Sequence, residues 1–376
     1  MSTILNIKLP QHAAKNYRIE VGPGLLKKLP GILKNMKPFQ GKPAARFVII
    51  TDTIVKSIAG EQLLQTLKKA GLQADLLTFP AGEKNKTEST HQKLTHQMLA
   101  KKCGRDTMVL ALGGGVVGDT AGYVAATYMR GVPYLQIPTS FLAMVDSSIG
   151  GKVGVDTPYG KNLVGAFWHP EGVIADVDSL KNLPREQLVN GLMESVKIFL
   201  TYDHAMFEFT RKNWKKILKK DAVCLQKIIA RSIELKIGVV TRDEFDANER
   251  MVVNWGHTIG HALEHLSRFQ FLHGYSVALG ILVESKIAQL LGVVSEKDFE
   301  TVRTAMKEFG IQEADLKKFT TSAVVKQTLI DKKAANGKVK YVLLEKIGKV
   351  KADARGMFGH EVESGIVKKA YDFFAK

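Results

Sequence analysis

The first half of the chain alternates short apolar segments with amphipathic ones, and this order constrains the fold more than any other feature. Apolar segments rich in β-branched residues lie at 46–51, 76–79 and 107–112, and amphipathic segments at 58–70 and 89–101 separate them. Strands that alternate with helices pair in parallel and carry the helices on both faces of the sheet. We therefore predict an α/β domain in this half.

The pattern changes near residue 184 to long segments of helical period, which predict a mainly α-helical second domain. These segments lie at 184–200, 222–240, 255–268, 276–291 and 361–374. An alternating segment at 339–344, followed by 348–352, predicts a late hairpin. We place the two domains at residues 1–178 and 179–376.

Chain length and cysteine content narrow the class of protein to which this chain can belong. The 376 residues suffice for two or three domains with real hydrophobic cores. Cys103 and Cys224 form no C-x-x-C pair, which excludes a disulfide framework and a thiolate zinc site. No segment is apolar enough to span a membrane, and Lys8, Pro10 and Lys15 stand where a signal peptide needs apolar residues. We expect a cytoplasmic protein that does not enter membranes.

Lysine and arginine exceed aspartate and glutamate by 17. Such an excess could attract nucleic acid, an anionic membrane or an anionic metabolite. Paired cations at 211–212, 215–216 and 219–220 have the pattern of a solvated helix face, which argues against specific nucleic-acid binding. Other cations, several of them beside Gly or Asn, suit a phosphate or carboxylate substrate: Arg130, Lys152, Lys161, Lys197, Lys236, Arg250, Lys332 and Lys333.

A glycine-rich turn follows the predicted strand at 107–112. Residues 113–118 read G-x-G-x-x-G and open a helix. Glycines there let a pyrophosphate approach backbone amides at a helix N-terminus, so the turn suits a dinucleotide. No acidic residue ends a strand about 20 positions later, and a plain strand-to-helix turn stays an alternative. Asp52 and Glu83 follow predicted strands, where they could meet ribose hydroxyls or cap turns.

Four of the ten histidines fall within residues 255–273. His257, His261 and His265 recur every fourth residue, so the first two project from one helix face, and His273 follows them. On the helix at 184–200, Glu194 and Lys197 share a polar stripe, which by itself is typical of a solvated face with an ion pair. Two of the histidines with the Glu194 carboxylate would make a metal site or a proton-transfer site.

Taken together, these motifs resemble the signature segments of the 3-dehydroquinate synthase family, within the sugar phosphate cyclases. Ten segments correspond in order, and one of them reads Gly-Leu-Met-Glu-Ser-Val-Lys at 191–197. The full set is 80–86, 113–119, 130–132, 138–139, 146–152, 160–162, 191–197, 254–264, 272–274 and 331–333.

The resemblance implies an N-terminal Rossmann-like NAD-binding α/β domain, a mainly α-helical C-terminal metal-binding domain and a homodimer. It implies that Glu194, His257 and His273 bind Zn²⁺ or Co²⁺. Residues implied to line NAD are Asp52, Glu83, Lys86, Gly114, Gly115, Val116, Asp119, Thr139, Ser140, Lys161 and Asn182. Residues implied to hold the substrate or act on it are Asp146, Lys152, Asn162, Lys197, Lys236, Asp246, Arg250, Asn254, His261 and one of Lys332 or Lys333. Arg130 would reach the phosphate site of the partner subunit.

The reaction that the resemblance implies converts 3-deoxy-D-arabino-heptulosonate 7-phosphate to 3-dehydroquinate and phosphate. Transient oxidation by NAD⁺ acidifies a neighbouring carbon, phosphate is eliminated, the hydride returns, and an aldol step closes the ring. NAD therefore acts as a catalyst. His261, one turn from His257, would transfer a proton near the metal.

Three positions depart from the family pattern. Tyr275 replaces a glutamate after the His-Gly pair, Met193 replaces an alanine, and Asp246 replaces a glutamate. A carboxylate beside a metal-bound histidine orients it, so the Tyr275 change could alter metal affinity or substrate choice. A sibling cyclase with another sugar phosphate and a metal-dependent NAD polyol dehydrogenase remain alternatives, although Arg250, Asn254 and His261 match the dehydroquinate-forming branch.

Overall fold

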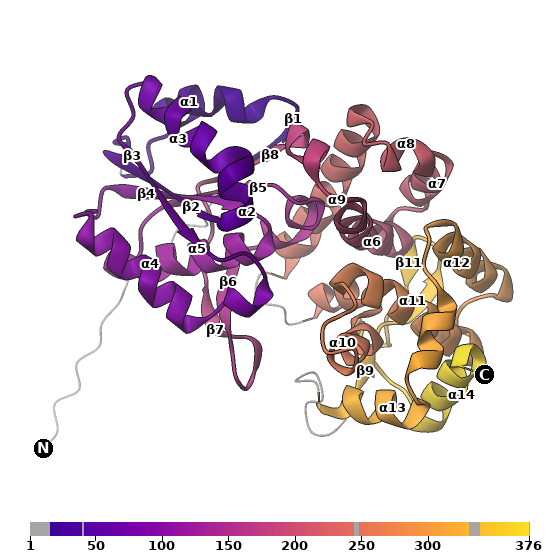
Figure 1. The fold of residues 1–376 in the computed structure, drawn as a ribbon. Helices are drawn as coiled ribbons and strands as arrows, with labels where there is room; N and C mark the ends of the chain where they lie inside the picture. The colour runs from indigo at the N-terminus through magenta and orange to yellow at the C-terminus, as the bar shows by residue number, and fades with distance from the viewer. Residues whose placement is uncertain (1–15, 40, 244–247, 331–338, 376) are drawn as a thin grey trace, which may run out of the picture.

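The computed structural model describes residues 16–39, 41–243, 248–330 and 339–375. Figure 1 shows two lobes, with the parallel sheet and its helices in the first and a cluster of helices in the second. The predicted fold class is confirmed.

The first lobe contains one sheet, one hairpin and the helices that cover the sheet. Its strands are β1 (Arg18–Gly22), β2 (Arg46–Asp52), β3 (Ala74–Phe79), β4 (Thr107–Gly113), β5 (Tyr134–Pro138), β6 (Lys152–Thr157), β7 (Gly160–Phe167) and β8 (Gly172–Asp176). Its helices are α1 (Leu25–Asn35), α2 (Thr53–Val55), α3 (Glu61–Lys69), α4 (Glu88–Ala100) and α5 (Gly115–Thr127). Short turns of other helix types are η1 (Lys56–Gly60), η2 (Glu83–Asn85), η3 (Tyr128–Arg130), η4 (Ala143–Ser147) and η5 (Val177–Asn182).

The six sheet strands run in the order β1-β8-β5-β4-β2-β3, and every pair is parallel. The chain moves from β2 outward to β3, then returns to β4 on the other side of β2 and continues to β5. The direction of winding therefore reverses between β2 and β4. In such sheets the crevice outside the carboxyl ends of the strands at this reversal is the usual ligand site.

Alternating side chains of the strands divide between two cores, one on each face of the sheet. Val109 and Ala111 pack with α4 and α5, whereas Leu110 and Leu112 pack with α1 and α3. The strands read as continuous apolar runs because both faces are covered.

The second lobe is mainly helical. Its helices are α6 (Arg185–Tyr202), α7 (His204–Lys212), α8 (Trp214–Leu218), α9 (Ala222–Arg242), α10 (His257–Leu266), α11 (His273–Leu290), α12 (Glu296–Glu308), α13 (Thr321–Ile330) and α14 (Ser364–Ala375). Two short turns, η6 (Glu249–Asn254) and η7 (Glu313–Lys318), join them, and the strands are β9 (Lys340–Tyr341), β10 (Leu344–Lys346), β11 (Lys349–Val350) and β12 (His360–Glu361). Helix α11 contacts α6, α10, α12 and α14 and forms the centre of the lobe.

The core of the helical lobe extends into the other lobe. Phe141, Met144 and Val145, which follow β5, belong to the same buried cluster as the apolar side chains of α6 and α11. Because this segment begins at the carboxyl edge of the sheet, shared packing holds that edge against the helices.

Gly274 permits the contact that brings α11 against α6. A Cβ at this position would overlap the backbone carbonyl oxygen of Asn190, and the Gly274 amide donates to Asn190 Oδ1 at 2.6 Å. His273 directly precedes Gly274, and Glu194 lies on the same helix as Asn190. The close approach of Gly274 to Asn190 therefore sets the distance between the side chains of His273 and Glu194.

Two local predictions were wrong. The late hairpin joins β10 to β11, while Lys340–Tyr341 pairs with β12, because the chain turns at Gly348 with a φ of 88°. Helix α11 begins at His273, three residues before the expected start. Lys152 and Lys161 lie on the antiparallel β6–β7 hairpin, where the glycines permit close backbone contact between the strands.

In the part of the chain that the structure describes, no helix combines the length and apolarity needed to cross a bilayer.

Substituting Gly274 tests the α6–α11 contact. We expect Gly274→Ala to lower the free energy of unfolding by at least about 1–3 kcal/mol, because the new methyl group meets backbone that cannot move aside. Gly31→Ala is the control, since a Cβ at Gly31 in α1 meets nothing within 4 Å. It should be neutral or stabilising by up to about 1 kcal/mol. Equal denaturation midpoints for the two variants would contradict the analysis.

Candidate active site

Three side chains from three helices converge between the lobes. Glu194 comes from α6, His257 from the first residue of α10 and His273 from the first residue of α11. Glu194 Oε1 lies 3.3 Å from His273 Nε2 and 3.9 Å from His257 Nε2. We call this set the Glu–His–His cluster.

The Glu–His–His cluster fits a divalent metal ion. Its ligand atoms lie within 4.8 Å of one another, and tetrahedral zinc bound at about 2.1 Å needs ligand atoms about 3.4 Å apart. Glu194 Oε1 is fully buried without a well-formed hydrogen bond to any described residue. A carboxylate oxygen in that position is costly unless a cation compensates it, so both the geometry and the charge favour a metal.

Opposite charges lie close together in the cluster. Burial alone would raise the pKa of Glu194, but Lys197 and His273 hold it below its ordinary value. Burial would lower the pKa of His273, yet the Glu194 and Glu264 carboxylates close to its two ring nitrogens raise it to about 10. Lys197 Nζ donates to Glu194 Oε2, and both side chains are at most 4% exposed.

The interpretation of Glu194 and Lys197 as a solvated face, drawn from that helix alone, is therefore wrong. Nearly every residue of α6 from Leu188 to Thr201 is buried, because α7, α9 and α11 surround the helix together with the β5–η4 segment. A buried polar stripe within such a helix needs internal partners, which Lys197, His257 and His273 provide.

Two further side chains of α10 reach the same cluster. The His261 ring centroid lies 5.2 Å from that of His257 and 5.9 Å from that of His273. Glu264 Oε2 lies 3.2 Å from His273 Nδ1, and this contact escaped the sequence analysis. The available signal was the spacing of His257, His261 and Glu264, which share one helix face.

An ion pair between buried Lys236 and half-buried Asp146 adjoins the Glu–His–His cluster. Lys236 Nζ on α9 lies 2.5 Å from both Asp146 Oδ1 and the Asp146 carbonyl oxygen. Burial would raise the pKa of Asp146, but Lys236 and Lys197 hold it well below its usual range. A cavity of about 10 Å³, room for one water molecule, is lined by both this pair and the Glu194–Lys197 pair. Four of the predicted site residues therefore meet in one space.

Arg250 and Asn254 lie on η6, beside the same edge of the site. Arg250 is buried, and a Cβ at Gly150 would lie 2.8 Å from its Nη2 atom. Asn254 Nδ2 donates to the Arg250 carbonyl oxygen at 3.3 Å. Gly150, with a φ of 96°, thus leaves the space that the guanidinium needs.

The β6–β7 hairpin connects to the sheet through Lys86. Lys86 Nζ lies 2.6 Å from Asp119 Oδ2 and 2.5 Å from Asn162 Oδ1, and Lys86 itself is buried. Burial raises the pKa of Asp119 to about 6, although Lys86 opposes the shift. Lys161, the neighbour of Asn162, lies 3.7 Å from Glu83 Oε1.

The glycine-rich turn lies at the carboxyl edge of the sheet. Gly114 is the N-cap of α5, and Gly115 approaches Ser147, whose Oγ would lie 3.1 Å from a Cβ at that position. Thr139 donates its amide to Gly113, and Ser140 Oγ lies 3.4 Å from the Cβ that Gly114 lacks. Half-buried Val116 occupies the first turn of α5. Free backbone amides at this N-terminus suit a pyrophosphate.

Asp52 ends β2 on the other side of the reversal in strand order. Its Oδ1 accepts the amides of Ile54 and Val55 at 2.8 Å, so it caps α2.

Other predicted site residues are exposed or lie outside the described residues. Lys152 opens β6 with an exposed side chain, and Asn182 is exposed at the end of η5. Arg130 is also exposed, at a φ of 67°. Asp246, Lys332 and Lys333 lie outside the described residues.

Tyr275 does not face the metal ligands. Its hydroxyl donates to Asp315 Oδ2 at 2.5 Å and accepts the Gln312 amide at 3.2 Å. The carboxylate contact to His273 comes from Glu264 instead.

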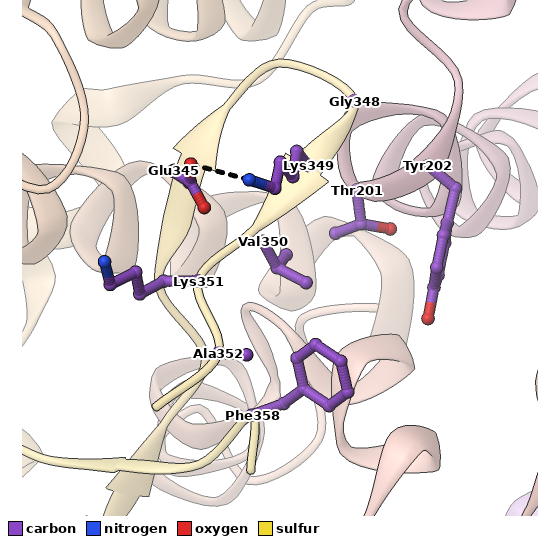
Figure 2. Close-up of a pocket in the computed structure, with 9 residues that line it drawn as sticks. All are labelled: Thr201, Tyr202, Glu345, Gly348, Lys349, Val350, Lys351, Ala352 and Phe358. Carbon is purple, nitrogen blue, oxygen red and sulfur yellow. Dashed lines mark hydrogen bonds and ion pairs between the residues drawn. The ribbon is translucent and has the colours of Figure 1, made fainter. Parts of the chain in front are cut away.

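A separate hollow of about 490 Å³ lies at the C-terminal end of α6, against the β10–β11 hairpin (Figure 2). Tyr202 and Phe358 line it together with Lys351. Glu345 and Lys349 neutralise each other there at 2.8 Å. The hollow contains none of the predicted site residues.

Comparison with known families covers most of the chain. Residues 76–190 match the family described as 3-dehydroquinate synthase N-terminal, and residues 191–334 match 3-dehydroquinate synthase C-terminal. A relative described as 3-dehydroquinate synthase from Thermodesulfovibrio yellowstonii is 41% identical over 304 residues, which is 81% of this chain and 85% of the relative.

Solved structures of cyclases share the fold. A 2-deoxy-scyllo-inosose synthase complexed with carbaglucose-6-phosphate, NAD⁺ and Co²⁺ is 25% identical with a TM-score of 0.86, covering 96% of this chain and 97% of that one. A 2-epi-5-epi-valiolone synthase from Streptomyces hygroscopicus, with NAD⁺ and Zn²⁺ bound, is 24% identical with a TM-score of 0.86, covering 98% of this chain and 99% of that one.

Removing Lys197 tests how the buried Glu194 charge is compensated. We expect Lys197→Met to cost about 3–5 kcal/mol of unfolding free energy in metal-free protein, because it leaves a buried carboxylate without its ammonium partner. Added Co²⁺ should recover more stability in this variant than in wild type, as measured by denaturant titration.

Lys181→Met is the matched control, since Lys181 also pairs with an acid three residues away but is 68% exposed. Its unfolding free energy should stay nearly unchanged. Similar losses of unfolding free energy in both variants would show that the burial of Glu194 does not increase the cost of removing its lysine partner.

Proposed function

The chain belongs to the 3-dehydroquinate synthase family, and we propose that it converts 3-deoxy-D-arabino-heptulosonate 7-phosphate to 3-dehydroquinate and phosphate. The Glu–His–His cluster is the observation that carries this proposal. It lies beside buried cations and is joined by shared core packing to the edge of the sheet where the glycine-rich turn opens α5. A reaction that combines redox chemistry with loss of phosphate needs all three features in one site.

Glu194, His257 and His273 would hold Zn²⁺ or Co²⁺. The donor set of one carboxylate and two imidazoles suits either ion and leaves a coordination position for substrate. When bound, the metal polarises substrate hydroxyls and NAD⁺ accepts a hydride and returns it.

The α5 N-terminus would receive the NAD pyrophosphate on the amides after Gly114. Asp52 ends β2, the strand next to β4 where the direction of winding reverses, and this position suits a contact with the ribose hydroxyls of NAD. The proposed NAD residues are Asp52, Glu83, Lys86, Gly114, Gly115, Val116, Asp119, Thr139, Ser140, Lys161 and Asn182.

The substrate carries a phosphate and a carboxylate, and the cations of the site would neutralise both. Lys197, Lys236 and Arg250 are buried, so their charges are already desolvated and oriented before substrate arrives. Asp146 holds Lys236 by its hydrogen bonds at 2.5 Å and limits where that ammonium can point. The remaining proposed substrate residues are Lys152, Asn162, Asp246, Asn254 and one of Lys332 or Lys333.

His261 would move a proton beside the metal. Its ring lies one helical turn from His257 and is only half-buried, so it can exchange a proton with substrate or water.

We also propose that the enzyme is a cytoplasmic homodimer with domains at 1–178 and 179–376. The exposed Arg130 would reach the phosphate site of a partner subunit, which a monomer would leave incomplete. The net charge of +17 would draw the anionic substrate toward the site, with no specific nucleic-acid partner.

An assay with catalytic NAD tests the function directly. Wild-type enzyme given the heptulosonate phosphate should release phosphate and form the carbocyclic product without net NADH. Chelation should abolish turnover, and Zn²⁺ or Co²⁺ should restore it, because the bound metal would polarise the hydroxyl on the carbon that gives up the hydride. Full turnover in metal-free enzyme would contradict the metal site, and NADH accumulating with a simple polyol would indicate a dehydrogenase instead.

Lys152 tests the proposed substrate cations. We expect Lys152→Ala to lower kcat/KM about 10- to 150-fold, the effect of losing a charge-assisted contact of about 1.5–3 kcal/mol. Lys349→Ala, on the remote β11 strand, serves as the control for removing an exposed lysine. Unchanged steady-state kinetics in Lys152→Ala would remove this residue from the site.

A further inference from the structure

We propose that Glu264 is a positioning residue, which orients the imidazole of His273 so that its Nε2 atom faces the metal. The inference rests on the proposed function, because it concerns the metal site of that reaction. It assigns a role to a residue that the sequence motifs did not single out.

The two nitrogens of His273 face different carboxylates. Nε2 lies 3.3 Å from Glu194 Oε1, and Nδ1 lies 3.2 Å from Glu264 Oε2. A neutral imidazole that binds metal through Nε2 carries its proton on Nδ1, and that proton needs an acceptor. Glu264 Oε2 lies where the acceptor must be, so it selects the tautomer and limits rotation of the ring.

The backbone of Glu264 is fixed at the end of α10. Its carbonyl oxygen accepts the Phe269 amide at 2.8 Å and the Ser267 hydroxyl at 2.9 Å, so a closing turn holds this last part of the helix. The residue itself is 7% exposed. Burial of the side chain on a fixed backbone limits its alternative rotamers, which is what an orienting group requires.

The second oxygen of Glu264 faces the other lobe. Glu264 Oε1 lies 4.0 Å from Lys161 Nζ on β7, and Lys161 also lies 4.4 Å from the centre of the Phe269 ring. This contact supplies positive charge near a buried carboxylate. At 4.0 Å from a lysine that is 39% exposed, it is too weak to orient His273 by itself.

Glu264 could instead be a metal ligand, because His261, Glu264 and His273 form a second group of possible ligands. The Glu–His–His cluster is the better site, since Glu194 Oε1 has no well-formed hydrogen bond to any described residue while Glu264 Oε2 already accepts from His273. The two roles differ in outcome. Loss of a ligand abolishes stoichiometric binding, whereas loss of an orienting group weakens binding.

The experiment measures Co²⁺ binding by full-length Glu264→Gln, without substrate or NAD. Competition against a chromophoric chelator gives the dissociation constant, and visible absorption of the bound Co²⁺ reports its geometry. We expect one ion per chain, an affinity about 10- to 100-fold below wild type, and an altered absorption spectrum. Glu264→Asp, which keeps the carboxylate, should recover part of the affinity and tests the contact if Glu264→Gln does not fold.

Lys161→Gln is the matched control, because it removes the other partner of Glu264 and leaves the contact to His273. Its Co²⁺ affinity should stay within about threefold of wild type. Wild-type affinity and spectrum in Glu264→Gln would overturn the proposal, as would complete loss of the ion or an equal loss in Lys161→Gln.

Failure of the proposed function is distinguishable from failure of this inference. Wild-type protein that binds Co²⁺ but releases no phosphate from the heptulosonate substrate would reject the function, while the affinity comparison still decides the role of Glu264. Wild-type protein that binds no Co²⁺ would overturn both.

Discussion

Compensation of one buried negative charge organises this structure. Glu194 is 3% exposed in the middle of a helix that is buried on nearly all sides, so its carboxylate requires positive partners in fixed places. Lys197 supplies one on the same helix, and His257 and His273 supply the others from α10 and α11. The close approach at Gly274 exists because those histidines must reach a carboxylate that cannot move toward them.

The site depends on both lobes because neither lobe carries all of its charged groups. The first lobe provides the amides at α5 and the acid Asp146, while the helical lobe provides the Glu–His–His cluster and Lys236. Shared packing of the η4 segment with α6 holds these groups in register. The β6–β7 hairpin adds Lys161 and Asn162, which reach residues of both lobes through Glu264 and Lys86.

Most of the architecture could be predicted because the spacing of apolar residues along the sequence shows which faces of a strand or helix are buried. The strands at 46–52 and 107–113 are apolar on both faces, and each lies within a residue of its predicted bounds. Periodicity gave the wrong burial for a helix that other elements surround on all sides. The polar stripe of α6 has the pattern of a solvated face, because the local sequence does not show which distant elements cover that face. Glu264 was missed for the same reason, since its partner His273 lies beyond a turn whose direction the local pattern does not encode.

Sequence alone determined the α/β and helical halves and the glycine-rich turn, and it singled out Glu194 and the histidines as candidate metal ligands, because these follow from local spacing and residue chemistry. Tertiary structure decided which nitrogen of His273 faces which carboxylate, that Tyr275 turns to Asp315, and that Lys86 joins Asp119 to the hairpin. These contacts join residues far apart in the chain or on separate elements. Their geometry is set by helix crossings and backbone clearances of a few ångströms, which no sequence period records.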